Sequence, residues 1–287
     1  MNPEKGGLAP GLYLVSTPIG NARDITLRAL DVLREADVLA AEDTRSLRRL
    51  LDIHGVAQGD RPCLAYHDHN GARMRPRILA ALAEGKSVAY ASEAGTPMIS
   101  DPGYDLVKAA QEAGAPVTAA PGPSAVVTAL TLAGLPTDRF LFAGFLPSTA
   151  AARRKALEEV AGVPATLAFY ESPRRLGAML ADAAQVLGPE RQARVVREVT
   201  KRFEEVRPGT LQELAEIYAE TPPKGEIVVV VDRGRSEKIS ESDIEASLRE
   251  ALQTMSVRDA ADFVSRMHGV KRRPVYQQAM QLSRDTD

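Results

Sequence analysis

The chain has 287 residues, of which 44% are hydrophobic and 26% are charged, and its formal net charge is −2. These values are typical of a soluble globular protein, and the length is sufficient for two domains and a smaller appendage. The apolar run Ile227–Val231 is far too short to span a bilayer, and residues 1–10 lack the apolar core of a signal peptide, so they predict a flexible tail. The single cysteine, Cys63, excludes an internal disulfide framework and favours a cytoplasmic location.

Residues 11–136 alternate short apolar segments with amphipathic ones. The apolar segments predict strands at residues 11–16, 38–41, 63–66, 87–91 and 117–119. The amphipathic segments predict helices from Asp24 or Thr26 to about Ala36, from about 44 to 53, from 72 to 84, after Gly103, and from 124 to 132. This alternation predicts an N-terminal α/β domain whose mostly parallel sheet is covered by helices on both faces.

Residues 137–235 predict a second α/β domain. The pattern changes near Thr137, and we interpret the strand Arg139–Phe145 together with Leu146 and Pro147 as a connector. Further strands are predicted near residues 166–170, 194–199 and 226–231, and helices near 174–187 and 211–219. Phe203–Val206 predicts an additional antiparallel strand, which makes the second sheet mixed.

Residues 236–287 predict a small helical module of the helix-turn-helix type. Ser256 to Asp259 resembles a capping box, Gly269 is expected to end that helix, and Pro274 suits the first position of the next one. The predicted apolar stripe of the first helix consists of Ala260, Phe263, Val264 and Met267. The basic run 271–273 lies at the joint, where it either contacts nucleic acid or only suits the helix ends.

The most informative segment is the loop Ser92–Gly103, which is rich in glycine and proline and follows a predicted buried strand. Open α/β sheets bind ligands at the carboxyl ends of their strands. Comparable loops follow other predicted strands at residues 16–21, 42–45 and 121–124. None matches the dinucleotide or P-loop patterns, which favours a nucleoside-type ligand. The alternative for Ser92–Gly103 is a tight connection between strand and helix with purely structural turn residues.

A series of motifs along nearly the whole chain resembles one known family. In chain order these are Thr17-Pro-Ile-Gly-Asn21, Ala41-Glu-Asp-Thr-Arg45, His67-Asp-His-Asn70, Ser92 to Gly103, Pro121-Gly-Pro, Gly134-Leu-Pro, Gly144-Phe-Leu-Pro147, Phe169-Tyr-Glu-Ser-Pro173, Arg197-Glu-Val-Thr-Lys201 and Lys224-Gly-Glu226. As a set they closely resemble the ribosomal RNA small subunit methyltransferase I family of the tetrapyrrole-methylase-like superfamily. Glu93 departs from the pattern, which has aspartate there, but it keeps the carboxylate.

The resemblance implies S-adenosylmethionine-dependent 2′-O-methylation of a cytidine in the decoding region of 16S rRNA. It implies a homodimer without membrane contact that acts on the small ribosomal subunit, and a cofactor cleft between the two α/β domains. The implied cofactor contacts are Thr17, Gly95, Thr96, Pro97, Ile99, Ser100, Ser124, Ala125, Tyr170, Lys224, Gly225 and Glu226. The turn Asp101-Pro102-Gly103 is expected to shape the loop without touching the cofactor.

A sugar hydroxyl is a poor nucleophile at neutral pH, so a positioned base would assist methyl transfer. The candidates are Asp43, Glu42 and His67, with Asp68 beside them, although a surface turn is the alternative for His67. The candidate RNA contacts are Arg45, Arg48, Arg49, Asn70, Arg174, Arg175, Lys271, Arg272 and Arg273. The histidines lack ligand-like spacing, so no metal site is expected.

Two other function classes stay open at this point. A methyltransferase acting on a small tetrapyrrole would resemble a family with a glycine-rich first loop, whereas this loop reads Ser16-Thr-Pro-Ile-Gly. A non-enzymatic RNA-binding assembly factor would not need the complete set of cofactor loops. Binding of S-adenosylmethionine and methylation of small subunits separate the three readings.

Overall fold

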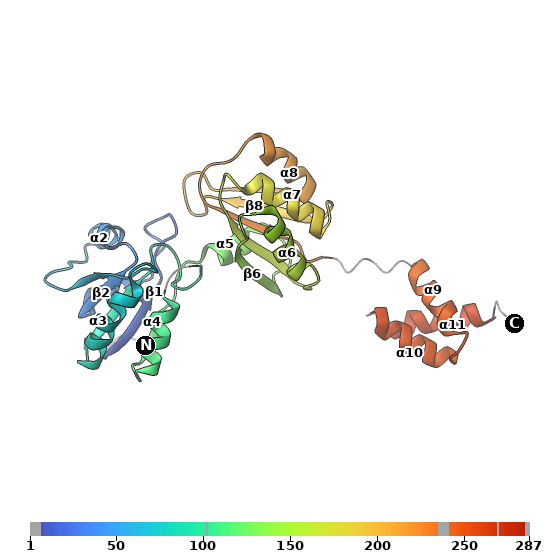
Figure 1. Ribbon diagram of the computed structural model, residues 1–287, viewed down its shortest axis with the longest axis horizontal. Helices are drawn as coiled ribbons and strands as arrows, with labels where there is room; N and C mark the ends of the chain where they lie inside the picture. Colours follow the sequence, from blue (N-terminus) through green and yellow to red (C-terminus); the bar gives the residue numbers. More distant parts are fainter. Residues whose placement is uncertain (1–6, 101–102, 235–240, 269, 285–287) are drawn as a thin grey trace. The chain divides into compact units, whose positions relative to one another are not determined.

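The computed structural model describes residues 7–100, 103–234, 241–268 and 270–284 (Figure 1). The chain divides into two compact units, residues 1–232 and 233–287, and each is described by itself. Most of the predicted N-terminal tail, residues 1–6, lies outside the described residues, as does the predicted turn at 101–102.

The first unit contains an all-parallel sheet in the order β3-β2-β4-β1-β5. Its strands are β1 (Gly11–Val15), β2 (Val38–Ala41), β3 (Cys63–Ala65), β4 (Ser87–Ala91) and β5 (Val117–Ala120). Helices α1 (Leu27–Glu35) and α2 (Thr44–Ile53) pack on one face, and α3 (Gly71–Ala83) and α4 (Tyr104–Glu112) pack on the other. The predicted parallel sheet with helices on both faces is confirmed.

The starts of α1 and α2 place two loops of the candidate site. Thr26, and not Asp24, caps α1 by accepting a hydrogen bond from the Ala29 amide at 3.1 Å. Asp43 caps α2 by accepting from the Arg45 amide at 2.8 Å. Because a cap satisfies amides that the helix leaves unpaired, each fixes where its strand-end loop stops.

The second sheet of the same unit has the order β6-β7-β10-β8-β9, in which β6 and β7 are parallel and the other pairs are antiparallel. Its strands are β6 (Phe140–Phe145), β7 (Thr166–Glu171), β8 (Gln192–Arg197), β9 (Glu205–Thr210) and β10 (Ile227–Val231). Helices α6 (Ala150–Ala161), α7 (Leu176–Leu187) and α8 (Leu211–Glu220) contribute buried residues to one core with this sheet. The predicted mixed sheet is confirmed, with its antiparallel edge strand starting at Glu205.

The strand predicted at Arg139–Phe145 is confirmed as β6, but its interpretation as a connector is wrong, and one helix was not predicted. The segment interpreted as a connector is the edge strand β6, which pairs with β7 from Phe140 opposite Thr166. Its four central residues are half-buried and its end residues Phe140 and Phe145 are exposed, because an edge strand lacks a neighbour on one side, and this weakens the apolar pattern. Helix α6 was not predicted, because its buried positions are Arg153 and Leu157 and they do not form an apolar stripe.

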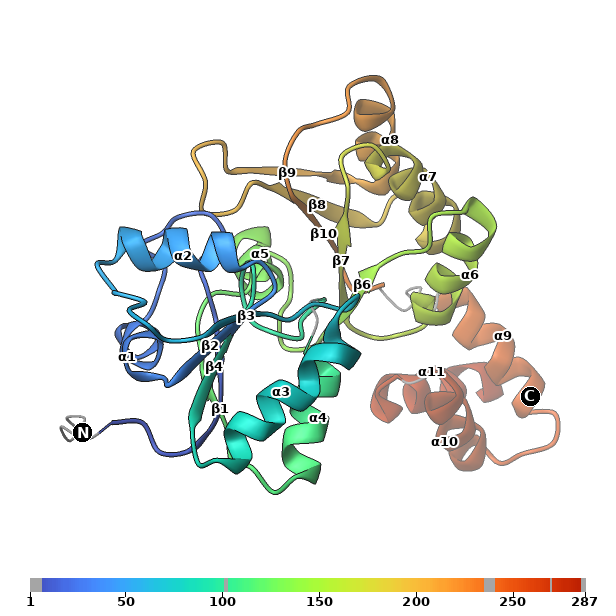
Figure 2. The ribbon, with the colours of Figure 1, turned by 60° about the vertical axis from the view of Figure 1, so that its left-hand side comes forward.

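Helix α5 (Ala125–Ala133) follows the last strand of the first sheet but packs against the second. Its residues Val126 and Leu130 share a buried cluster with Val196 and Val228. Figure 2 shows α5 beside the strands of the second sheet. The predicted domain boundary after residue 136 stays a prediction, and this helix couples the two halves of the unit on either side of it.

The described residues of the second unit form three helices, α9 (Glu241–Ala251), α10 (Val257–His268) and α11 (Arg272–Arg284), whereas two were expected. Ser256 accepts from the Asp259 amide at 3.2 Å, and Pro274 is the third residue of α11 rather than the first. The predicted stripe is wrong at Phe263 and Met267, which are 49% and 63% exposed, since Ala260, Ala261 and Val264 face the core. The predicted stop at Gly269 lies outside the described residues. Among the residues that the structure describes, no helix is long and apolar enough to cross a membrane.

Candidate active site

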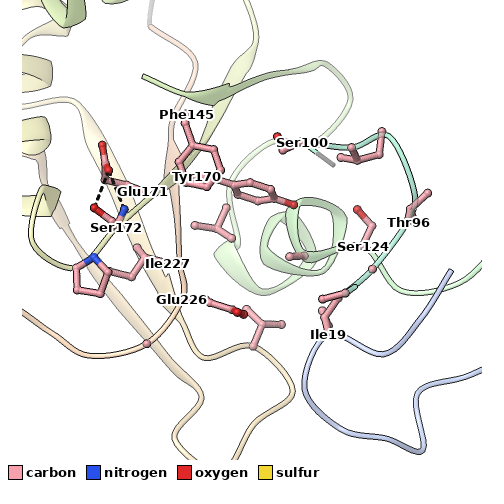
Figure 3. Close-up of a pocket in the computed structure, with 18 residues that line it drawn as sticks. Ile19, Thr96, Ser100, Ser124, Phe145, Tyr170, Glu171, Ser172, Glu226 and Ile227 are labelled. Atoms are coloured by element: carbon pink, nitrogen blue, oxygen red, sulfur yellow. Dashed lines mark hydrogen bonds between the residues drawn. The ribbon is translucent and has the colours of Figure 1, made fainter. Parts of the chain in front are cut away.

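One cavity of about 370 Å³ is built jointly by the two sheets of the first unit (Figure 3). Its volume lies within the range of about 300–1,000 Å³ that small-molecule sites occupy. The residues that line it are Ile19, Ala94, Gly95, Thr96, Ile99, Ser100, Ser124, Ala125, Phe145, Tyr170, Glu171, Ser172, Pro173, Val199, Gly225, Glu226, Ile227 and Val228. The predicted ligand loop and the predicted second-domain turn therefore meet at one site.

The wall from the first sheet is a loop held by backbone hydrogen bonds. Thr17 and Gly95 exchange both amide–carbonyl bonds, at 2.9 and 3.0 Å, and the Thr17 hydroxyl donates to the Ser92 carbonyl at 3.2 Å. Gly95 has a φ of +82°, and a Cβ atom there would press on Ile19. A glycine is required because this left-handed backbone and this close approach both disfavour a side chain.

Further along this loop the backbone stays unusual. Met98 and Ser100 have φ values of 72° and 63° although neither is glycine. Non-glycine residues adopt this region infrequently, and they concentrate at functional loops where the surrounding structure holds them. The Thr96 hydroxyl donates to the Pro123 carbonyl at 2.9 Å, which ties the loop to the start of α5.

Polar groups from this wall are available to a ligand. Ser124 is the N-cap residue of α5, but its hydroxyl caps no amide of the helix. Within the described parts of the chain, the hydroxyls of Ser100 and Ser124 make no hydrogen bond, and both residues line the cavity. Figure 3 shows the Tyr170 ring reaching across the cavity toward the side where Ser100 and Ser124 lie.

The wall from the second sheet is built from packed side chains and a charged turn. The Tyr170 ring packs edge-on against Phe142 and Phe145, with centroid distances of 4.7 and 5.5 Å. Gly225 has a φ of +93°, and a Cβ atom there would overlap the Glu198 carboxyl group. This turn therefore also requires glycine.

A network of charges holds the turn at Gly225 in place. The Glu198 carboxylate accepts from the Glu226 amide at 3.0 Å, and Lys201 Nζ lies 3.0 Å from Glu198 and 2.9 Å from Glu226. The bond from the Glu226 amide, together with Lys201, lowers the pKa of the Glu198 carboxyl. A carboxylate that stays charged in this way keeps the turn closed around the cavity.

The four predicted catalytic groups, Glu42, Asp43, His67 and Asp68, follow the ends of the neighbouring strands β2 and β3. Burial raises the pKa of the Glu42 carboxyl, and the nearby charges of Glu93 and Asp68 raise it further, while His67 opposes them. Asp43 differs, because Arg45 contacts both of its carboxylate oxygens and lowers its pKa to about 2. The geometry therefore separates Glu42, which is half-buried among charges, from Asp43, which caps a helix and pairs with an arginine.

The predicted cofactor contacts divide into two groups. Nine of the twelve line the cavity, from Gly95 through Glu226. The other three do not line it: Thr17 holds the loop from behind, Pro97 is buried within the loop, and Lys224 precedes the Gly225 turn. Residues that the motifs contained without being singled out include Phe145, Ser172, Pro173 and Val199, whereas Val228 gave no signal beyond its apolar character.

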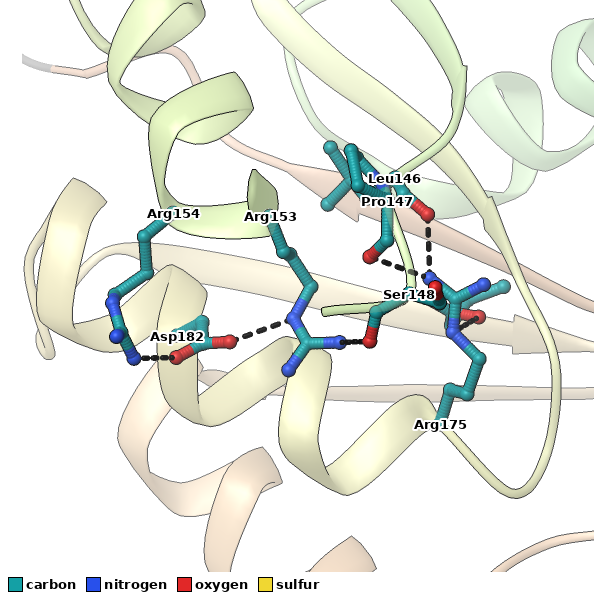
Figure 4. A network of polar contacts seen from close by, with 8 residues as sticks. Leu146, Pro147, Ser148, Arg153, Arg154, Arg175 and Asp182 are labelled. Atoms are coloured by element: carbon teal, nitrogen blue, oxygen red, sulfur yellow. Dashed lines mark hydrogen bonds and ion pairs between the residues drawn. The ribbon is translucent and has the colours of Figure 1, made fainter. Parts of the chain in front are cut away.

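Several predicted RNA contacts already have structural partners. The Asn70 side chain accepts from the His67 amide and donates to the Ala65 carbonyl, which closes the loop after β3. Arg175 donates to the Leu146 and Pro147 carbonyls and lies 3.2 Å from the buried Glu171 carboxylate (Figure 4). Arg272 pairs with Asp262 and lies over the Tyr276 ring. The remaining predicted contacts are exposed: Arg45, Arg48, Arg49, Arg174, Lys271 and Arg273. Two of these also have partners within the protein, because Arg45 pairs with Asp43 and Arg48 donates to the Gln58 side chain.

Two neighbouring arginines of helix α6, Arg153 and Arg154, have a structural role. Arg153 is buried in α6 and donates to Asp182 at 2.6 Å, and Arg154 contacts the other oxygen of the same carboxylate at 3.0 Å (Figure 4). Within the described residues, no group of histidine, cysteine and acidic side chains has the arrangement of a metal site.

Comparison with known proteins adds independent information. Residues 11–215 match the family described as Tetrapyrrole (Corrin/Porphyrin) Methylases, and residues 239–283 match the RsmI C-terminal HTH domain. A protein of Mesorhizobium japonicum named Ribosomal RNA small subunit methyltransferase I is 49% identical over 276 residues, which are 96% of this chain and 93% of that protein. The protein of the same name from Escherichia coli O157:H7 is 42% identical, over 94% of each chain. This chain belongs to the ribosomal RNA small subunit methyltransferase I family.

Membership of the ribosomal RNA small subunit methyltransferase I family confirms the resemblance drawn from the motifs and the expected helix-turn-helix module. A solved structure of uroporphyrin-III C-methyltransferase from Thermus thermophilus complexed with S-adenyl homocysteine has a TM-score of 0.54 at 22% identity, and the match covers 77% of this chain and 96% of that one. This likeness supports the fold, in which the two α/β sheets of the first unit are arranged as in the tetrapyrrole methylases.

Proposed function

We propose that this protein uses S-adenosylmethionine to methylate ribosomal RNA of the small subunit, at the ribose 2′-oxygen of a cytidine in the decoding region of 16S rRNA. The observation that carries the proposal is the cavity that both sheets build, in a chain whose relatives are named for small-subunit rRNA methylation. The cytidine and its 2′-oxygen come from the motif resemblance.

The cavity fits the proposed cofactor in size and in the chemistry of its walls. Ile19, Val199 and Val228 offer apolar surface for an adenine ring. The hydroxyls of Ser100 and Ser124 offer hydrogen bonds to polar ribose or amino-acid groups. Gly95 from the first wall and Gly225 from the second both line the cavity, so backbone atoms are close to a ligand at these two positions. A Cβ atom at Gly95 would press on Ile19, and one at Gly225 would overlap Glu198.

Bound S-adenosylmethionine would supply an activated methyl group on a sulfonium, so that an oxygen–carbon bond forms as a sulfur–carbon bond breaks and the hydroxyl proton leaves. The two walls would hold the reactants in line and exclude water, which accounts for much of the acceleration in such a displacement. Among the two proposed carboxylate bases, Glu42 suits proton abstraction better than Asp43, because burial raises its pKa whereas Arg45 lowers that of Asp43. Asp43 and His67 would position the loops beside it.

The RNA-facing part of the proposal uses exposed cations. Arg45, Arg48 and Arg49 lie on α2 next to the strand ends, and Arg174 follows β7. Lys271 and Arg273 are exposed in the C-terminal unit. Such side chains bind phosphates and make affinity dependent on salt. We further propose a homodimer that works in the cytoplasm, where small ribosomal subunits are modified.

Two measurements test the proposal. Isothermal titration with S-adenosylmethionine should give one site per chain, and no detectable heat would contradict both the cofactor and the enzymatic reading. Methyl incorporation into small subunits that lack the modification should block alkaline cleavage of 16S rRNA at the target ribose, since a 2′-O-methyl group prevents it.

The same assays separate the alternatives. Methylation of a tetrapyrrole with no incorporation into subunits would indicate the small-molecule reading. Subunit binding without titratable cofactor would indicate an assembly factor.

A further inference from the structure

A second cavity, of about 320 Å³, lies at the carboxyl edge of the first sheet. Its lining includes Tyr66, His67, Asp68, Arg75, Tyr104 and Asp105, from the loop after β3 and the first turns of α3 and α4. Figure 2 shows both helices beginning on the side of the first sheet that faces the second sheet. Unlike the first cavity, it is lined mainly by polar and charged side chains.

One wall holds a hydrogen-bond donor beside an acceptor. Arg75 Nη2 donates to Asp105 Oδ2 at 2.6 Å, and Arg75 Nε donates to the Tyr66 hydroxyl at 3.5 Å. Tyr66 is buried and packs edge-on against Tyr90, at a centroid distance of 5.6 Å, which fixes that hydroxyl. Arg75 Nη1 and Asp105 Oδ1 have no hydrogen-bond partner among the residues described, so one donor and one acceptor remain for a ligand.

The same cavity offers an aromatic ring to a ligand. Tyr104 is 66% exposed, and its ring packs against no other ring in the described parts of the chain. Large exposed aromatic side chains beside polar groups are the usual platforms on which unpaired RNA bases stack.

Charged residues around Glu42 connect the linings of the two cavities electrostatically. His67 and Asp68 line the second cavity, and their charges act on Glu42. Glu93 also acts on Glu42, and it directly precedes Ala94, which lines the first cavity. Glu42 therefore interacts electrostatically with two residues that line the second cavity and with the neighbour of a residue that lines the first.

We propose that the second cavity binds the base of the acceptor nucleotide, with Tyr104 stacking on it and the Arg75–Asp105 pair reading an amino-pyrimidine edge. This inference rests on the proposed methylation of RNA. Cytosine presents an amino donor next to ring nitrogen and carbonyl acceptors, which matches the free Asp105 oxygen and the free Arg75 amino group. Uracil presents a carbonyl in place of the amino group and a ring N–H in place of the ring acceptor. The uracil carbonyl would then face the Asp105 oxygen and the uracil N–H would face the Arg75 amino group, so neither pair could form a hydrogen bond.

The decisive experiment compares two substrates in one assay. Small subunits are reconstituted with 16S rRNA that carries either cytidine or uridine at the target position, and initial rates of methyl incorporation give kcat/KM for each. The parent should prefer cytidine, and Asp105→Asn should reduce the cytidine-to-uridine ratio by about 10- to 100-fold. Glu112→Gln is the matched control, because Glu112 is also an ion-paired carboxylate on α4 but lies outside both cavities, and it should keep the parental ratio.

Two further variants test the donor and the ring. Arg75→Met should raise the KM for cytidine-containing subunits by about 10-fold, whereas Arg77→Met, on the same helix outside the cavity, should not. Tyr104→Ala should weaken subunit binding by about 10-fold and Tyr104→Phe should restore it, since a base stacks on either ring. Circular dichroism and titration with S-adenosylmethionine check that each variant is folded and binds cofactor like the parent.

The outcomes separate the two proposals. A parent that methylates neither substrate overturns the proposed function. A methylating parent whose cytidine-to-uridine ratio is unchanged by Asp105→Asn and Arg75→Met overturns the base subsite alone. An equal rise of KM for both substrates in Arg75→Met, with the ratio intact, would mean that the cavity holds a phosphate instead of a base.

Discussion

The two walls of the first cavity are built in different ways. The wall from the first sheet is a loop whose shape comes from backbone hydrogen bonds, such as the paired bonds between Thr17 and Gly95, and from positive φ values. The wall from the second sheet consists of the packed rings of Phe145 and Tyr170 and of a turn held by the Glu198–Lys201–Glu226 network. The first wall, which is fixed by backbone geometry, should tolerate few substitutions. In the second wall the Gly225 turn shares this property, whereas changes among the packed rings should weaken ligand binding in small steps.

The largest effect is expected from Thr96→Arg in the first wall. The long cation would fill the cavity and break the bond from the Thr96 hydroxyl to the Pro123 carbonyl. Binding of S-adenosylmethionine should weaken by more than about 100-fold in isothermal titration, because overpacking and an unpaired charge both oppose the ligand. Thr131→Arg on the exposed side of α5 is the control, and equal affinities in the two variants would remove Thr96 from the site.

Glu42→Gln tests the strand ends beside the same wall. It should reduce kcat by about 100-fold while cofactor affinity stays within a few-fold of the parent, because a base acts on the acceptor and not on the cofactor. Because the Glu42 pKa is raised, the parent should lose activity as the pH falls through that pKa and the carboxylate becomes protonated. The variant should lack this acid limb.

Asp43→Asn is the control for Glu42→Gln. Asparagine caps a helix nearly as well as aspartate, so turnover and cofactor affinity should both stay close to those of the parent. A large loss of turnover in Asp43→Asn, with Glu42→Gln unaffected, would exchange the roles of the two carboxylates.

Gly225→Ala tests the charged turn of the second wall. The added Cβ would displace the Glu198 carboxylate from Lys201 and from the Glu226 amide, in a backbone conformation that alanine disfavours. We expect about 2 kcal/mol of lost stability in thermal unfolding and about 10-fold weaker cofactor binding. Gly188→Ala has a comparable φ of 104° with no atom nearby, so it should lose less stability and keep parental cofactor affinity.

Phe145→Ala should have the smallest effect. Its ring is 57% exposed and contacts the cavity and Tyr170, so its removal should weaken cofactor binding by about 3- to 10-fold, the equivalent of one aromatic pair. Phe140→Ala is matched to it, because Phe140 lies on the same strand at 46% exposure but outside the cavity. A loss for Phe145→Ala as large as that for Thr96→Arg would contradict the difference between the two walls.

Much of the fold followed from local patterns. The strands of the first sheet could be predicted because each is a short apolar segment between turn residues, and the helices between them have capping residues such as Thr26. Helix α6 could not be predicted, since it buries Arg153 against Asp182, a pairing 29 residues apart that no local pattern contains. The strand β6 was missed as part of the sheet for a similar reason, because its partner β7 begins after the whole of α6.

The candidate site was predictable in part. The loops carrying Gly95, Ser124 and Gly225 were identified from their motifs, and all three line one cavity. The different environments of Glu42 and Asp43 were not predictable, since neighbouring residues in a sequence look equivalent until burial acts on one and Arg45 on the other. The second cavity was also not predictable, because it depends on the approach of α4 to α3.

The sequence by itself determined the family, the loops that face a ligand and most of the strands and helices, because apolar periodicity, glycine turns and motif series are local properties of the chain. Only the tertiary structure decided which groups act together. Thr17 supports the loop from behind, Asn70 and Arg175 use their polar atoms within the protein, and Arg75 meets Asp105 across two helices. These roles depend on burial and on contacts between distant segments, and those exist only after the chain has folded.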